Sequence, residues 1–140
     1  MSGDVQTARV DVFTATRDDL TRFDPVAGPT SVGWQCIDST EWSRGLDRLV
    51  AEISGHDLSD FGDHELVFPD RAAGDWEGPW LVRVPDDVVD ALAELSQDDI
   101  ARFAERASLG EDLTARTMGV WEMCQRARGE RRDVYQWSTD

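Results

Sequence analysis

The clearest helical pattern in the chain lies between Ser39 and Gly55. Apolar residues recur there at intervals of three or four positions, namely at Trp42, Leu46, Leu49, Val50 and Ile53. This spacing places them on one face of a helix. Ser39 or Thr40 can cap the N-terminus, and glycine commonly follows the last residue of a helix. We therefore predict an amphipathic helix whose apolar face contacts the core.

Two consecutive helices are predicted from Pro85 onward. Proline suits the first helical position, and the helix dipole stabilises Asp86 and Asp87 in the first turn. Ser96 and Asp99 have capping-box spacing and begin the second helix. The positions predicted to face the core are Val88, Val89, Leu92, Leu95, Ile100, Phe103, Ala104 and Ala107.

A long helix is predicted near the C-terminus and a short one near the N-terminus. The long helix runs from about Asp112 to Arg128 and stops at Gly129. Its buried residues are predicted to be Leu113, Val120, Trp121 and Cys124. The short helix is capped by Thr16, with Asp19 three positions later, and the segment ends at Pro25.

Five short stretches have the composition of strands: residues 8–16, 34–38, 65–69, 80–84 and 133–137. The first alternates Val10 and Val12 with Asp11 and Phe13, which suits a strand with two distinct faces. We predict an α+β fold, with residues 1–140 forming a single domain. One small sheet of four or five strands would be packed by about five helices on one side. The pattern does not predict the strand order.

The net charge is −15, and most of the acidic excess lies between Asp57 and Asp99, here called the acidic band. Thirteen acids against two arginines give the acidic band −11, whereas residues 116–132 carry five arginines against two glutamates, or +3. An acidic surface repels nucleic acid and anionic membranes and favours a basic partner. We expect the C-terminal arginines to pair with the protein's own acids or to cap the helix, rather than to bind phosphates.

Missing residue types and motifs exclude several chemistries. The chain has no lysine, which excludes Schiff-base catalysis and the lysine-bearing phosphate loop. Cys36 and Cys124 are predicted to be buried, reduced thiols. The N-terminus lacks the basic start and apolar block of a signal peptide, and no apolar run approaches the roughly 20 residues of a membrane span. We therefore expect a cytoplasmic protein that does not contact membranes.

Two tryptophans flank a turn in the segment DWEGPW, residues 75–80. Trp80 begins a strand and is predicted to lie in the core or on a strand face. Trp76 lies between Asp75 and Glu77, where its ring either folds onto the core or meets a partner, because tryptophan is a preferred interface anchor. Alternatively, the two rings and the nearby carboxylates could form the site of a small-molecule-binding or hydrolytic enzyme.

Residues 56–65 concentrate side chains of the types that bind metals. The candidate ligands are His56, His64 and Glu65, beside Asp57, Asp60 and Asp63. Neither helical His-x-x-x-His spacing nor a twelve-residue calcium loop occurs. We interpret the segment as a solvated acidic loop, and we predict no metal, no cofactor and no catalytic residue.

Three segments resemble the bacterial YfbM-type family of small uncharacterised proteins. They are the Trp-bearing helix STEWSRGLDRLVAEISG, the Pro-acid-acid helix and its successor in VPDDVVDALAELSQDDIARF, and the closing CQRARGERRDVYQW. The resemblance implies an α+β fold, no established activity, and some association with toxin–immunity neighbourhoods. It carries over no functional residue.

The sequence favours a non-enzymatic interaction protein of immunity or inhibitor type. Its basic protein partner would bind the region 57–99, and the predicted contacts are Asp57, Asp60, Asp63, Asp75, Trp76 and Glu77. Two alternatives stay open: the enzyme described above, and an acidic protein whose charge serves only solubility. The oligomeric state is not predicted.

Overall fold

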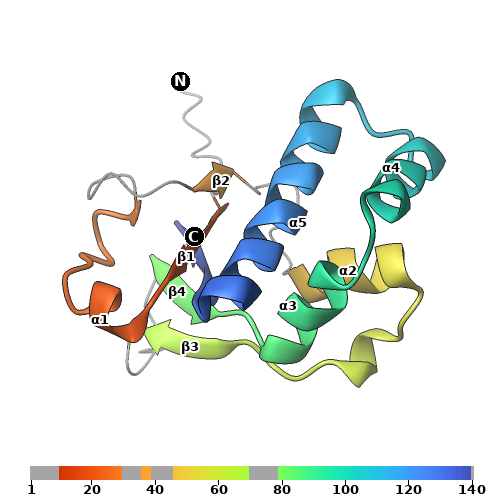
Figure 1. The fold of residues 1–140 in the computed structure, drawn as a ribbon. Coiled ribbons are helices and arrows are strands. Elements are labelled where there is room, and N and C mark those ends of the chain that lie inside the picture. The colour runs from red at the N-terminus through yellow and green to blue at the C-terminus, as the bar shows by residue number, and fades with distance from the viewer. Residues whose placement is uncertain (1–9, 30–35, 39–45, 70–78, 140) are drawn as a thin grey trace.

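The computed structural model describes residues 10–29, 36–38, 46–69 and 79–139, and its centre is a five-stranded antiparallel sheet (Figure 1). The strands are β1 (Val10–Ala15), β2 (Ile37–Asp38), β3 (Glu65–Phe68), β4 (Trp80–Arg83) and β5 (Asp133–Ser138), in the order β2-β1-β5-β4-β3. The last strand of the chain therefore lies in the middle of the sheet. Its partner β1 pairs along its whole length, from Val10 opposite Ser138 to Ala15 opposite Asp133.

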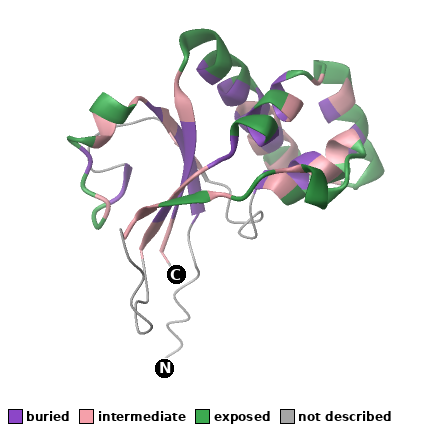
Figure 2. Ribbon diagram, turned by 90° about the horizontal axis from the view of Figure 1, so that it is seen from below, coloured by how far each residue is buried: buried purple, intermediate pink, exposed green. Residues whose placement is uncertain are grey.

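Helices cover both sides of this sheet unequally. They are α1 (Arg17–Leu20), α2 (Leu46–Ser54), the 3-10 helix η3 (Leu58–Asp60), α3 (Asp86–Ala93), α4 (Gln97–Arg106) and α5 (Glu111–Glu130). The group α2 to α5 lies on one side, and α1 with the loop after it lies on the other (Figure 2). The predicted α+β class is confirmed. The expectation that all helices lie on one side is wrong for α1, because Phe13 on β1 and Phe23 after α1 form a second apolar cluster there.

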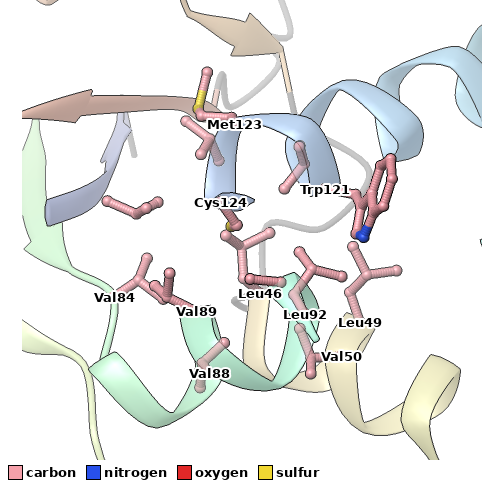
Figure 3. Close-up of a cluster of buried hydrophobic side chains, with 14 of the residues drawn as sticks. Leu46, Leu49, Val50, Val84, Val88, Val89, Leu92, Trp121, Met123 and Cys124 are labelled. Carbon is pink, nitrogen blue, oxygen red and sulfur yellow. The ribbon is translucent and has the colours of Figure 1, made fainter. Parts of the chain in front are cut away.

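The larger core cluster joins the sheet to α2, α3, α4 and α5. Val12 of β1 and Val134 of β5 belong to it. So do Val84, which directly follows β4, and Leu46 of α2 and Leu92 of α3 (Figure 3). Leu49 and Val50 are also buried, which confirms the predicted apolar stripe of α2 where it is described. Trp42 and the predicted caps Ser39 and Thr40 lie outside the described residues.

The C-terminal end of α3 is held by side chains of α5. The last carbonyls of a helix lack donors within the helix. Trp121 donates from Nε1 to the carbonyl oxygen of Leu95 at 2.9 Å, and Gln125 donates from Nε2 to that of Ala93 at 3.2 Å. Trp121 therefore packs in the core and also satisfies a carbonyl beyond the end of α3.

Two predicted helix details are wrong by one residue. Pro85 precedes the first helical position as the N-cap, with an extended backbone (φ −59°, ψ 147°), and α3 begins at Asp86. Proline has no N–H to donate, so it fits either position. Ala107 is exposed instead of facing the core, because α4 ends at Arg106 and the chain leaves the helix there.

The predicted stop at Gly129 is also wrong. Helix α5 continues to Glu130, and Arg131 adopts the left-handed conformation (φ 57°). The N–H of Arg132 then donates to the carbonyl oxygen of Ala127 at 2.8 Å, which closes the end of the helix. The side chain of Arg132 contacts the N-terminal part of the chain, with its Nη2 3.1 Å from Oδ2 of Asp19 and 3.4 Å from the carbonyl oxygen of Thr14. These contacts join the end of α5 to the region of α1.

Asp19 links the predicted capping box of α1 to Arg132, the residue before β5, and its pKa is lowered. The Thr16 hydroxyl accepts from the Asp19 N–H, and the Asp19 carboxylate accepts from the Thr16 N–H at 3.0 Å. This backbone hydrogen bond, followed by the Thr16 side chain and the charge of Arg132, lowers the pKa of Asp19 below its ordinary value of 3.8.

Acid should therefore destabilise the protein in part through Asp19. A lowered folded-state pKa contributes stability above the unfolded value, and that contribution is lost as the pH falls below 3.8 towards the folded value. Urea unfolding of the wild type and of Asp19→Asn checks this at neutral pH and near pH 3. The variant should lose less stability between the two conditions. An equal loss in both proteins would show that Asp19 does not contribute.

Candidate functional site

The loop between α2 and β3 is tied to the start of α3. The backbone N–H of Gly62 donates to Oδ2 of Asp87 at 2.8 Å. Within the loop, the N–H of Asp57 donates to Oδ2 of Asp60 at 3.3 Å. Acids that are up to thirty residues apart in the acidic band therefore lie on one surface around the N-terminus of α3.

Several acids in the rest of the acidic band contact arginine side chains or backbone N–H groups of the protein itself. Asp86 accepts from Arg83 at 2.7 Å. Asp90 and Glu94 lie 3.7 and 3.8 Å from the guanidinium of Arg128. The Asp99 carboxylate accepts from the backbone N–H of Ser96 in the capping box of α4. Pairing of Arg128 with the protein's own acids agrees with what we expected of the C-terminal arginines.

The loop acids differ from these residues. Asp57, Asp60, Asp63 and Glu65 are exposed, and none of them forms an ion pair with an arginine or histidine in the described parts of the chain. Four carboxylates within nine positions repel one another, and this repulsion is relieved when a cation approaches.

Two exposed leucines accompany these acids. Leu58 in η3 is 40 % exposed, and Leu66 in β3 is 41 % exposed. The third large hydrophobic residue on the described surface is Val26, which follows α1. We call the set Asp57, Leu58, Asp60, Asp63, Glu65 and Leu66 the acidic loop surface. It combines apolar area with charge, as protein interfaces do.

The candidate metal ligands occupy the same loop. His56 is exposed, with its ring edge-on to Phe61 at a centroid distance of 6.0 Å, and His64 is half-buried. Across residues 10–29, 36–38, 46–69 and 79–139, no three His, Cys, Asp or Glu side chains are grouped so that they could hold a metal ion.

The tryptophan turn is described only at its end. Trp80 is half-buried in β4 and lies opposite Ser138 of β5, so it lies on a strand as predicted. Asp75, Trp76 and Glu77 lie outside the described residues.

A polar cluster that the sequence did not suggest lies where β4, β5 and α3 meet. Arg83 is placed between two carboxylates, 3.0 Å from Asp133 and 2.7 Å from Asp86. The hydroxyl of Tyr135 donates to Asp133 at 3.4 Å, and burial raises the pKa of Tyr135 to about 12. The cluster therefore links the sheet to α3.

The two cysteines differ in exposure. Cys124 is buried as predicted, and burial raises the pKa of its thiol to about 12. Cys36 is only half-buried. Because the thiolate is the reactive form, Cys124 should be inert in the folded protein.

We expect the variant Cys36→Ser, which retains Cys124, to resist a thiol-reactive dye until denaturant unfolds it. Labelling followed by mass spectrometry measures this. Rapid modification without denaturant would contradict the burial of Cys124.

Comparison with known proteins gives no match to a family model, to a curated protein or to a solved structure. The resemblance to the YfbM-type family stays a prediction. No described helix is both long enough and apolar enough to cross a membrane.

Proposed function

We propose that this protein is a non-enzymatic interaction protein, of immunity or inhibitor type, that binds a basic protein partner through the acidic loop surface. One observation carries the proposal: within residues 57–66, exposed acids without a cationic partner in the described chain occur together with two exposed leucines. Asp75, Trp76 and Glu77 remain candidate contacts on the sequence argument alone.

Within the acidic band, some acids are paired with arginines and the loop acids are not, and this difference supports the choice of surface. Arg83 and Arg128 each contact two carboxylates and offset one of the two negative charges, so these acids attract a partner less per residue. The loop acids have no such cationic partner among the described residues and would accelerate the encounter with a basic surface. Leu58 and Leu66 would then lose exposed apolar area in the complex, which stabilises it.

Capture from the native host at low salt tests the proposal. The loop variant carries Asp57→Asn, Asp60→Asn and Asp63→Asn, and asparagine retains an oxygen that accepts the hydrogen bond within the loop. The matched control removes three exposed charges from α4 and α5 by Glu105→Gln, Glu111→Gln and Glu122→Gln.

We expect the wild type and the control to retain the same basic protein, and the loop variant to lose it. Retention by all three proteins alike would show that the acidic loop surface is not the binding site. Retention of no basic protein by the wild type would contradict the proposed function itself.

A further inference from the structure

Two consecutive residues, Phe61 and Gly62, anchor the loop between α2 and β3. The side chain of Phe61 packs against the larger core cluster. The N–H of Gly62 donates to Oδ2 of Asp87 at 2.8 Å. A Cβ built at Gly62 lies 3.6 Å from that oxygen and 3.9 Å from Cβ of Pro85, which is ordinary van der Waals contact. The loop therefore lies directly against the start of α3 at this point.

The anchored pair determines where the neighbouring charges lie. Asp60 directly precedes Phe61 and Asp63 directly follows Gly62, and both acids are exposed. Repulsion among the loop carboxylates favours a more expanded loop. Asp87 adds another negative charge, but its carboxylate accepts a charge-assisted hydrogen bond and is stabilised by the dipole of α3. The hydrogen bond therefore opposes the repulsion that would expand the loop.

We propose that Asp87 is a positioning residue, whose hydrogen bond to Gly62 holds Asp60 and Asp63 in the arrangement that binds the basic partner. This inference rests on the proposed function and gives a role to a residue outside the acidic loop surface. Asp87 lies on α3, whose buried face belongs to the larger core cluster. A loop that is already ordered loses less conformational entropy when a partner binds, so the held loop binds more tightly than a released one.

Two substitutions of Asp87 separate the hydrogen bond from the charge. Asp87→Asn and Asp87→Ala remove the same charge, but only asparagine retains a side-chain oxygen that can accept from Gly62. The matched control Asp98→Ala removes an exposed carboxylate from the same position in the first turn of α4. Amide hydrogen exchange of Gly62 in the free protein measures whether the loop is held. Urea unfolding and binding of the basic protein captured by the wild type are measured for each variant.

We expect the Gly62 amide to exchange about tenfold faster in Asp87→Ala than in the wild type. Asp87→Asn and Asp98→Ala should retain most of its protection. Asp87→Ala should also bind the captured basic protein about threefold more weakly than Asp87→Asn, although the two variants carry the same charge. The free energy of unfolding should fall by similar amounts in Asp87→Ala and Asp98→Ala, because each loses one first-turn carboxylate.

Equal exchange of Gly62 in Asp87→Ala and Asp87→Asn would overturn the inference that Asp87 holds the loop. Faster exchange in Asp87→Ala, with equal binding by both variants, would overturn its positioning role and leave the proposed function standing. Capture of no basic protein by the wild type would overturn the proposed function and the role of Asp87 in binding together.

Discussion

Replacing Gly28 by alanine is expected to lower the free energy of unfolding by about 3 kcal/mol. Gly28 has a φ of +89°, and a Cβ built there lies 2.8 Å from Cη2 and Cζ2 of Trp137. The indole cannot move away easily, because its Nε1 donates to the carbonyl oxygen of Pro25 at 2.7 Å and the ring is buried. Left-handed strain and the clash with the ring therefore add.

Gly55 provides the matched control for this substitution. Its φ is +80°, but an added Cβ meets no atom within 4 Å. Gly55→Ala should therefore cost only the conformational strain, about 1 kcal/mol. Urea unfolding of both variants and the wild type measures the difference. Equal losses would mean that the packing of Gly28 on Trp137 does not contribute to stability.

The double substitution Leu58→Ser and Leu66→Ser is expected to raise the dissociation rate of the partner complex about thirtyfold. Each leucine is about 40 % exposed. Burial of this exposed area in the complex is worth roughly 1 kcal/mol per side chain. The association rate should change little, because the loop charges that set it are untouched.

Val26→Ser is the control for the double variant, because Val26 is 62 % exposed and follows α1, away from the acidic loop surface. Surface plasmon resonance with the captured partner measures both rates. If Val26→Ser raises the dissociation rate as much as the double variant does, the leucines have no specific role.

Local patterns predicted the helices well because their signals lie within a few residues. The capping boxes at Thr16 and Ser96 are both present, with Asp19 and Asp99 as their partners. The end of α5 could not be predicted in this way. Arg131, and not Gly129, adopts the left-handed conformation there, although glycine is the residue type that most favours it. The central place of β5 depends on long-range pairing with β1 and β4.

The candidate site was predicted in composition but not in arrangement. The sequence identified Asp57, Asp60 and Asp63 as partner contacts, and the structure places all three on an exposed loop. The sequence could not show which acids are paired with arginines, because Arg83 and Arg128 are brought to those carboxylates by a turn and by helix packing. The exposure of Leu58 and Leu66 likewise follows from tertiary structure.

The most direct test of the acidic loop surface is the association rate of the captured partner as a function of ionic strength. Salt screens exposed charges, so the wild-type rate should fall about tenfold or more between about 50 and about 300 mM salt. The loop variant with Asp57→Asn, Asp60→Asn and Asp63→Asn should start lower and fall less. A wild-type association rate that does not change with salt would contradict the account.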